Sequence, residues 1–299
     1  MIELPTELRR GLLGFGDFGR VWVDELPLRL ERLCRRWDLD LGAPFEPGGV
    51  TSWVAPAGPD LVVKVVVPHP EAAHEAAALR AWDGEGAVRL LAEAPEDHAL
   101  LLERCRPGGA LREAGRPDDE VLDLAAGTAV RLWRPVPDDA PYDRLATVMA
   151  AWAHMVEERA ATVALALDNA MIAEGARLLR ELPHTAEGEV LLHGDLHPAN
   201  LLAAEREPWL AIDPKPMRGD PAFDLPPLVL QAGDPLASPD PAAELDRRVR
   251  RVAAATGVDP DRIRAWGIAR SVEMAVWEQA KDVPPGPWDA AVWARLLAG

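Results

Sequence analysis

The stretch that decides the fold is LHGDLHPANLL, residues 192–202, together with LAIDP, residues 210–214. Two apolar runs, each of the length of a short buried strand, flank a polar loop. The loop contains Asp195 and, five residues later, Asn200, and the second apolar run ends in Asp213. This order places two carboxylates and one amide next to a pair of strands. The combination is far more specific for a functional site than any one of these residues alone.

Phosphoryl transfer uses this set of side chains. One carboxylate accepts or orients the proton of the attacking hydroxyl, while an asparagine and a second carboxylate hold Mg²⁺, an ion that prefers oxygen ligands. The order of the motif predicts Asp195 as the catalytic base, and Asn200 and Asp213 as the metal ligands.

Two other interpretations of the loop stay open at this point. His193, Asp195 and His197 could form a transition-metal site, since imidazole and carboxylate both bind such metals. That site would leave Asn200 without a role, and no further group of ligands follows it. Asp195 and Asn200 could also cap turns, as Asx side chains often do. Turn capping explains each residue singly but not the whole set.

A second part of the predicted site is Lys64, in the apolar stretch LVVKVVV. Of the 32 basic residues 29 are arginine, so a lysine within a strand is unusual for this chain. A buried lysine is rarely left unpaired. The next helix offers Glu71 and Glu75, and we expect Glu75, deeper in the helix, to position Lys64 at the α- and β-phosphates of a nucleotide. The alternative is an edge-strand lysine that extends its ammonium group to solvent.

A glycine-rich stretch near the N-terminus, GFGDFGRV at residues 14–21, matches two phosphate-loop patterns. Its flanking segments are helical in pattern, and Lys64 lies far beyond one hairpin, so we interpret these glycines as a turn and helix boundary. We expect the hairpin that covers the phosphates at residues 48–52, where Ser52 or a backbone N–H would contact them.

The segment LLERCRPGG, residues 101–109, links the two regions of the chain. An adenine between them would lie against this strand and use the backbone C=O of Glu103 and the N–H of Cys105. A plain interdomain linker is the alternative, and both can hold at once.

The overall pattern predicts an α+β fold with two lobes. Residues 1–104 form the N-terminal lobe, with a helical extension over 1–40 and a nucleotide-binding antiparallel sheet with one main helix over 44–104. Residues 105–299 form a larger, mainly helical lobe that carries catalysis and acceptor binding. Its long helices are expected at 143–160, 165–182, 241–255, 260–281 and 287–298.

Composition excludes several classes of protein. The chain has 299 residues, a formal net charge of −17, 48% hydrophobic residues and 27% charged residues, which is typical of an ordinary globular protein. The negative charge argues against a partner that is a nucleic acid. No apolar run is long enough to cross a membrane. Two cysteines without metal or disulfide spacing suit a reducing compartment, so we expect a cytoplasmic protein.

On these motifs the chain resembles the aminoglycoside phosphotransferase family, which shares the protein-kinase-like fold. Further stretches are similar to one branch, the streptomycin 6-kinases and hydroxyurea-type resistance kinases. The stretches that carry the resemblance are VVKVV around Lys64, WDGEGAVRLL (82–91), LLERCRPGG (101–109), HGDLHPAN (193–200) and AIDPKPMRGDPAFDL (211–225).

The resemblance implies ATP as the phosphoryl donor and Mg²⁺ as the cofactor. It implies that Asp224 holds the catalytic loop, and we expect His193 to support the same loop. Lys215 and Arg218 do not follow from general kinase chemistry; either they meet the transferring phosphate or they pair with Asp220.

The resemblance also implies a small-molecule antibiotic as the acceptor. Streptomycin is the first choice because its guanidinium groups suit an acidic cleft, for which the candidates are Glu273, Trp277, Glu278 and Asp282 on a late helix. A kinase for hydroxyurea or another small metabolite is the first alternative. A catalytically idle nucleotide-binding regulator is the second alternative. Such a protein usually loses one of the four residues Lys64, Asp195, Asn200 and Asp213, and this chain has all of them. The sequence does not indicate the oligomeric state.

Overall fold

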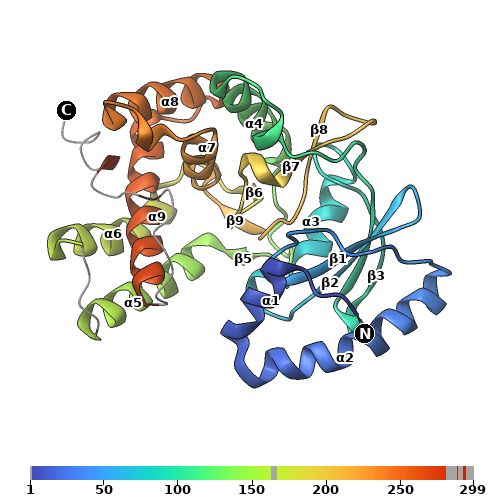
Figure 1. Cartoon of the computed structure of the whole chain (residues 1–299). Helices are drawn as coiled ribbons and strands as arrows, with labels where there is room; N and C mark the ends of the chain where they lie inside the picture. Colours follow the sequence, from blue (N-terminus) through green and yellow to red (C-terminus); the bar gives the residue numbers. More distant parts are fainter. Residues whose placement is uncertain (1, 163–166, 281–287, 289–291, 294–299) are drawn as a thin grey trace. The chain divides into compact units, whose positions relative to one another are not determined.

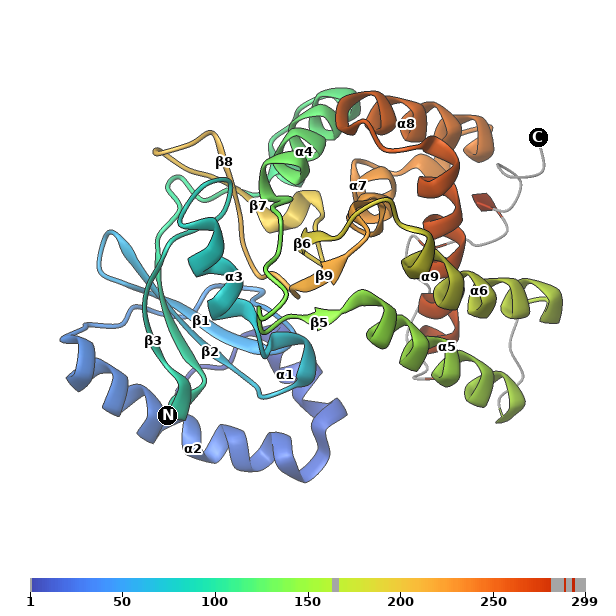
Figure 2. The same ribbon diagram turned by 180° about the vertical axis from the view of Figure 1, so that it is seen from behind.

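The computed structural model describes residues 2–162, 167–280, 288 and 292–293. The chain forms two compact units, which are described separately. The first consists of Met1–Gly108 and Ala203–Leu210, and the second of Gly109–Leu202 and Ala211–Gly299. Figures 1 and 2 show the elements of both units from opposite sides.

The first unit begins with two helices, α1 (Thr6–Leu12) and α2 (Gly16–Trp37). The helical extension predicted over residues 1–40 is present, and Trp22, Leu26, Leu30 and Leu33 of α2 are all buried. A 3₁₀ turn, Leu13–Phe15, separates the helices, and Gly16 has a positive φ of 55°. The glycine-rich stretch is therefore a helix boundary and not a phosphate loop.

A four-stranded antiparallel sheet follows in the order β1-β2-β4-β3. Its strands are β1 (Ser52–Ala57), β2 (Leu61–Val66), β3 (Leu90–Ala94) and β4 (Ala99–Glu103). Apolar side chains of α1 and α2 share one buried core with Val63 and Val65 of the sheet. Since side chains alternate along a strand, Lys64 points to the opposite face, where α3 (Glu75–Trp82) supplies its partner.

The expected phosphate hairpin at residues 48–52 was wrong. The hairpin of this region joins β1 to β2 through Gly58, and residues 48–51 form an irregular lead into β1. This lead packs on the N-terminal helix: a Cβ on Gly11 would lie 2.0 Å from Val50 O, and one on Gly48 would lie 2.4 Å from Pro5 Cβ. The local glycine pattern did not reveal this packing between distant segments.

The segment 203–210 belongs to the first unit although it follows the polar loop of residues 193–200 in sequence. Arg206 attaches it by donating to the carbonyls of Gly84, at 2.6 Å, and Ala87, at 3.2 Å. The same guanidinium also donates to Glu103. The first unit is thus built from two separate stretches of the chain.

The second unit is mainly helical. Its helices are α4 (Asp118–Leu132), α5 (Leu145–Thr162), α6 (Asn169–Glu181), α7 (Leu225–Gln231), α8 (Pro241–Thr256) and α9 (Pro260–Ala280). Helix α9 packs against α5, α6, α7 and α8. The helix expected at 287–298 lies mostly outside the described residues. None of the described helices has both the length and the apolar character that a membrane crossing requires.

Short strands frame the polar loop of the second unit. The strands β5 (Asp143–Arg144), β9 (Met217–Gly219) and β6 (Val190–Leu192) form a three-stranded sheet in that order, and β7 (Leu201–Ala203) pairs with β8 (Trp209–Ala211). The sequence predicted β6 and β8. It missed β5, β7 and β9, which are too short to show a hydrophobic period.

Several 3₁₀ turns connect these elements. Besides Leu13–Phe15 they are Pro70–Ala72, Pro95–Asp97, Leu111–Glu113, Leu182–Thr185, Pro198–Asn200, Pro221–Asp224 and Pro235–Ala237.

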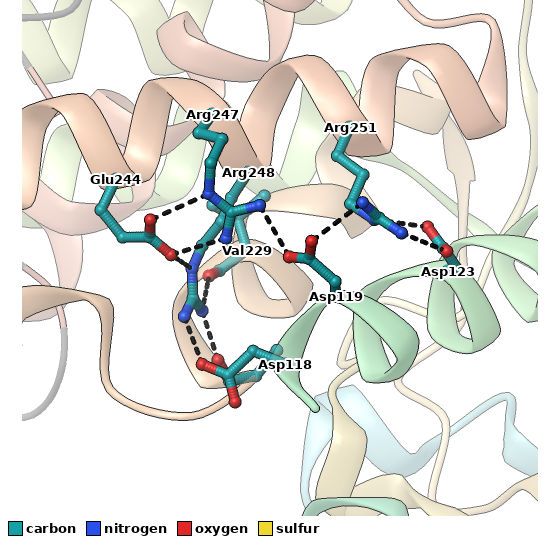
Figure 3. Close-up of polar contacts among 9 residues, drawn as sticks. Asp118, Asp119, Asp123, Val229, Glu244, Arg247, Arg248 and Arg251 are labelled. Atoms are coloured by element: carbon teal, nitrogen blue, oxygen red, sulfur yellow. Dashed lines mark hydrogen bonds and ion pairs between the residues drawn. The ribbon is translucent and has the colours of Figure 1, made fainter. Parts of the chain in front are cut away.

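Helices α4 and α8 are joined by charged side chains (Figure 3). Arg247, Arg248 and Arg251 of α8 contact carboxylates at the start of α4. Those carboxylates belong to Asp118, Asp119 and Asp123. Arg248 is buried and also donates to Val229 O of α7 at 3.2 Å. Hydrogen bonds from Arg247 and then Arg248 lower the pKa of Glu244 to about 2. The network ties α4, α7 and α8 together.

Candidate active site

The candidate catalytic loop begins where β6 ends. Gly194 has a φ of 80°, and a Cβ there would lie 2.0 Å from the carbonyl oxygen of Lys215. Both conditions require glycine, because other residues rarely adopt this conformation and none fits the space. The backbone N–H of Lys215 donates to His193 O at 2.7 Å, so the two segments are fixed side by side.

Asp224 holds this loop through hydrogen bonds to its backbone, in agreement with its expected structural role. Its carboxylate accepts hydrogen bonds from His193 N at 3.0 Å, Gly194 N at 2.8 Å and Trp133 Nε1 at 3.1 Å. Asp224 is fully buried, and burial raises the pKa of its carboxyl group while the backbone donors oppose the rise. The sequence did not reveal Trp133 as a partner, since nothing local marks it.

His193 uses both ring nitrogens within the loop. Nε2 lies 3.1 Å from Ile212 O, and Nδ1 accepts from Asp195 N at 3.3 Å. Burial lowers the pKa of His193 to about 4, so the ring is neutral near pH 7. A ring engaged in this way supports the loop and is unsuited to bind a metal. No cluster of three metal-binding side chains occurs among the described residues, which contradicts the transition-metal alternative.

Asn200 and Asp213 are linked through Ile212. Asn200 Nδ2 donates to Asp195 O at 3.0 Å, and Ile212 N donates to Asn200 O at 2.9 Å. The amide hydrogen bond resembles a turn cap, and it leaves Oδ1 as the atom for a ligand. Asp213 follows directly, with a φ of 56°. An amide oxygen and a carboxylate are the hard donors that suit Mg²⁺, so this pair fits the expected ion.

Asp195 combines a fixed backbone with an accessible carboxylate. Its N–H and C=O are held by His193 and Asn200 as described, while 36% of its side chain is exposed. His197 Nε2 lies 3.8 Å from Asp195 Oδ1, and burial lowers the pKa of His197. A partly exposed carboxylate on a rigid loop has the properties of a general base.

The alternative in which Lys215 and Arg218 pair with Asp220 was wrong. Lys215 Nζ lies 3.0 Å from Asp213 Oδ2. Arg218 belongs to β9 and pairs with Glu189 at 2.8 Å. Asp220 instead accepts from Arg262, at 2.7 Å, and from Trp266. Asp220 follows β9 and caps the 3₁₀ turn Pro221–Asp224, where its side chain accepts from Ala222 N.

In the first unit Lys64 pairs with Glu75 as predicted. Lys64 Nζ lies 2.6 and 2.7 Å from the two carboxylate oxygens, and both side chains are at most 6% exposed. Glu71 lies in a 3₁₀ turn and is exposed. The buried ammonium group contradicts the alternative of a solvent-reaching lysine.

The other predicted nucleotide contacts also lie in the first unit. Ser52 is buried at the start of β1, opposite Val66. Glu103 ends β4, and its carboxylate accepts from Arg206 and from Arg89 N. Burial raises the pKa of the Cys105 thiol to about 12, so it stays protonated. The expected backbone contacts of Glu103 and Cys105 with adenine stay predictions.

The predicted acceptor residues lie on α9. Glu273 and Glu278 are each 7% exposed, and Trp277 is 38% exposed. The fourth candidate, Asp282, lies outside the described residues. The role of these residues in binding the acceptor stays a prediction.

The first unit holds a Lys–Glu pair beside an antiparallel sheet. The second unit holds Asp195 and Asn200 on one loop and Asp213 just after β8. This set of side chains is typical of kinases. Solved structures support this class at the level of the fold. The chain is similar to a choline kinase from Streptococcus pneumoniae, with a TM-score of 0.61, 13% identity, and coverage of 90% of this chain and 98% of that chain. It is also similar to an aminoglycoside phosphotransferase from Streptomyces rimosus solved with ADP and streptomycin, with a TM-score of 0.59, 20% identity, and coverage of 83% and 98%. The fold is therefore protein-kinase-like, as predicted.

The chain belongs to the aminoglycoside/hydroxyurea antibiotic resistance kinase family, whose sequence model matches residues 48–282. It is 37% identical to a hydroxyurea phosphotransferase of Kitasatospora aureofaciens, over 100% of this chain and 87% of that protein. It is 34% identical to a streptomycin 6-kinase of Streptomyces glaucescens, over 93% and 91%. The family assignment confirms the predicted branch, and the enzyme is a phosphotransferase that acts on an alcohol group.

Proposed function

We propose that this protein is an ATP-dependent O-phosphotransferase that modifies a hydroxyl group of a small-molecule antibiotic, with streptomycin as the leading acceptor. The observation that carries the proposal is the close arrangement of Asp195, Asn200 and Asp213. Asp195 N donates to His193 Nδ1, Asn200 Nδ2 donates to Asp195 O, and the N–H of Ile212, next to Asp213, donates to Asn200 O. An ATP-dependent enzyme of this kind would act in the cytoplasm, where its donor is abundant.

In the proposed reaction the acceptor oxygen forms a bond to the γ-phosphorus, and the bond from that phosphorus to the β–γ bridging oxygen breaks. The proton of the hydroxyl moves to the carboxylate of Asp195. Mg²⁺, when bound, neutralises charge on the phosphates. Asn200 Oδ1 and the Asp213 carboxylate would hold the ion.

The nucleotide would be held by the first unit. Lys64, fixed by Glu75, would contact the α- and β-phosphates, as the equivalent lysine–glutamate pair does in protein kinases. Two structurally similar proteins support a nucleotide donor: the phosphotransferase from Streptomyces rimosus solved with ADP, and an aminoglycoside 2'-phosphotransferase solved with GDP at a TM-score of 0.61. Glu103 and Cys105 would offer their backbone groups to the adenine.

The choice of streptomycin rests on the relatives and on charge. Streptomycin 6-kinases are 34% and 33% identical to this chain, and a streptomycin 3''-kinase is 32% identical. The buried carboxylates of Glu273 and Glu278 would suit guanidinium groups. Hydroxyurea is the second candidate, because a hydroxyurea phosphotransferase is 37% identical over the whole chain.

A catalytically idle regulator is disfavoured, because all four predicted residues are present and anchored. Asn200 is bonded to Asp195 O and to the N–H of Ile212, next to Asp213, and Lys64 is paired with Glu75. A regulator has no need to keep this set in place.

The test is ADP release with Mg-ATP and a panel that includes streptomycin, other aminocyclitols and hydroxyurea. We expect turnover with streptomycin, and its loss in Asp195→Asn with an unchanged melting temperature. The control is Glu187→Gln, which changes an exposed acid in the same unit and should keep full activity. ADP release with hydroxyurea but not with streptomycin would show that hydroxyurea, and not streptomycin, is the acceptor. An equally active Asp195→Asn would overturn the mechanism.

A further inference from the structure

Lysine is rare in this chain, and the structure places the described lysines in two particular positions. The sequence has three, Lys64, Lys215 and Lys281, of which Lys281 lies outside the described residues. Arginine forms the structural ion pairs, such as those between α4 and α8 in Figure 3. Lys64 and Lys215 instead each contact a carboxylate of the candidate active site. A compact ammonium suits a phosphate as a point charge, whereas the arginine fork suits fixed bidentate pairs.

The backbone of Lys215 is attached rigidly to the catalytic loop. Its N–H donates to His193 O at 2.7 Å, and its C=O rests on Gly194, where a Cβ would come within 2.0 Å. Pro214 and Pro216 flank it, and they restrict the backbone on both sides. The side chain therefore starts from a fixed point directly beside the residue that precedes Asp195.

The ammonium group lies on the carboxylate that is proposed to hold the metal ion. Nζ is 3.0 Å from Asp213 Oδ2 and 3.4 Å from Asp213 O, and 18% of the side chain is exposed. An ammonium group has three N–H donors. Among the described residues these two oxygens are its protein acceptors, so one donor remains for a ligand.

We propose that Lys215 is a catalytic residue whose ammonium group contacts the transferring phosphoryl group. The inference rests on the proposed function, since it needs a phosphate bound next to Asp213. If Asp213 also holds the metal ion, the ammonium group of Lys215 would lie next to a phosphate bound to that ion. Negative charge spreads over the oxygens of this phosphoryl group in the transition state, and a fixed donor aimed at it lowers the barrier.

A structural role makes a different prediction. If Lys215 served to hold the Asp213 carboxylate in place, its loss would disturb the metal ion first. If it served stability alone, its loss would lower the melting temperature and leave the kinetics unchanged. The two predictions separate metal affinity, turnover and stability.

The experiment replaces Lys215 with methionine, which keeps the length of the side chain and removes the charge. We expect kcat to fall by about 10²- to 10³-fold, with little change in KM for ATP. We expect Mn²⁺ to bind the ADP complex with unchanged affinity, measured by electron paramagnetic resonance. Mg-ADP should still raise the melting temperature, whereas the extra rise with aluminium fluoride, which mimics the transferring phosphoryl group, should be lost.

The matched control is Arg218→Gln, which removes a cation three residues later whose partners are Glu189 and Asp138. It should lower the melting temperature and keep the rise with aluminium fluoride. If Lys215→Met does not fold, Lys215→Gln is measured in the same way.

Two results would overturn the proposal: an unchanged kcat, or weaker Mn²⁺ binding together with turnover that recovers at high Mg²⁺. The hypothesis about the acceptor is tested by a separate result. Wild-type enzyme that transfers phosphate to no acceptor refutes the proposed function, whereas the aluminium fluoride measurement needs no acceptor and still reports on Lys215.

Discussion

Replacing Asp224 with asparagine tests how the catalytic loop is held. Oδ2 of the carboxylate accepts from His193 N and Trp133 Nε1, and Oδ1 accepts from Gly194 N. Asparagine has one oxygen and one NH₂ group. If its oxygen keeps the two donors at Oδ2, its NH₂ faces the N–H of Gly194. Two donors then meet where no solvent reaches them.

The cost follows from these contacts. A hydrogen bond to a charged group contributes roughly 1.5–3 kcal/mol, and a buried unpaired N–H costs roughly 1–3 kcal/mol. Part of this loss in stability is offset, because the substitution also removes a charge whose burial is unfavourable. The same unfavourable burial raises the pKa of Asp224. We expect a net loss of about 2–4 kcal/mol in the free energy of unfolding. The melting temperature should fall by about 5–15 °C.

Activity should fall as well, since the repulsion acts on the residue next to Asp195. A displacement of a catalytic group by about 1 Å can cost about 10²-fold in rate. The assay is kcat at saturating ATP and acceptor, together with the melting temperature. Asp220→Asn is the control: Asp220 is also buried and accepts from Ala222 N and Arg262, but it does not bind the loop. It should lower stability to a similar degree and leave kcat nearly unchanged.

Two results would refute this reasoning. An Asp224→Asn variant with unchanged stability would show that the three hydrogen bonds contribute little. A variant that loses stability but keeps kcat would show that Asp224 supports the unit and not the loop.

Three further predictions use other contacts. Lys64→Met removes the ammonium group that pairs with the buried Glu75 carboxylate, so stability should fall by about 3–5 kcal/mol and KM for ATP should rise; an unchanged KM would contradict the phosphate role. Gly194→Ala should cost more than the roughly 1–2 kcal/mol of a left-handed backbone alone, because its Cβ would meet Lys215 O; denaturant unfolding measures the loss, and a neutral effect would contradict the close approach. Burial lowers the pKa of His193 to about 4 from 6.5, so the unfolded chain binds a proton first as the pH falls. Wild type should therefore lose about 3 kcal/mol relative to His193→Asn between about pH 6.5 and 4, and parallel stability curves would contradict this.

The parts of the site that sequence could predict are those set by local pattern. The Asp195 loop is a continuous motif between two strands. Lys64 and Glu75 belong to neighbouring elements, and the burial of Lys64 in an apolar strand required an acid on the next helix. In each case the relevant partners lie within a short stretch, so residue type and spacing were enough.

The parts that sequence missed depend on contacts between distant segments. The glycines at residues 48 and 49 indicated a hairpin, but α1 packs on this segment and keeps it irregular. The partner of Arg218 depends on a three-residue strand, and Trp133 reaches Asp224 across 91 positions of sequence. No local spacing of apolar or polar residues predicts any of these contacts.

Residues 203–210 belong to the first unit although the second unit's first segment precedes them in the sequence. This arrangement constrains the order in which the protein can fold during synthesis on the ribosome. Arg206 supplies bonds to Gly84 O, Ala87 O and Glu103 that the first 108 residues cannot make by themselves. The first unit is therefore complete only after synthesis has passed the loop that carries Asp195. A gene cut between the two units would yield an N-terminal product that lacks this attachment, so the halves of this kinase cannot be exchanged among relatives at a single junction.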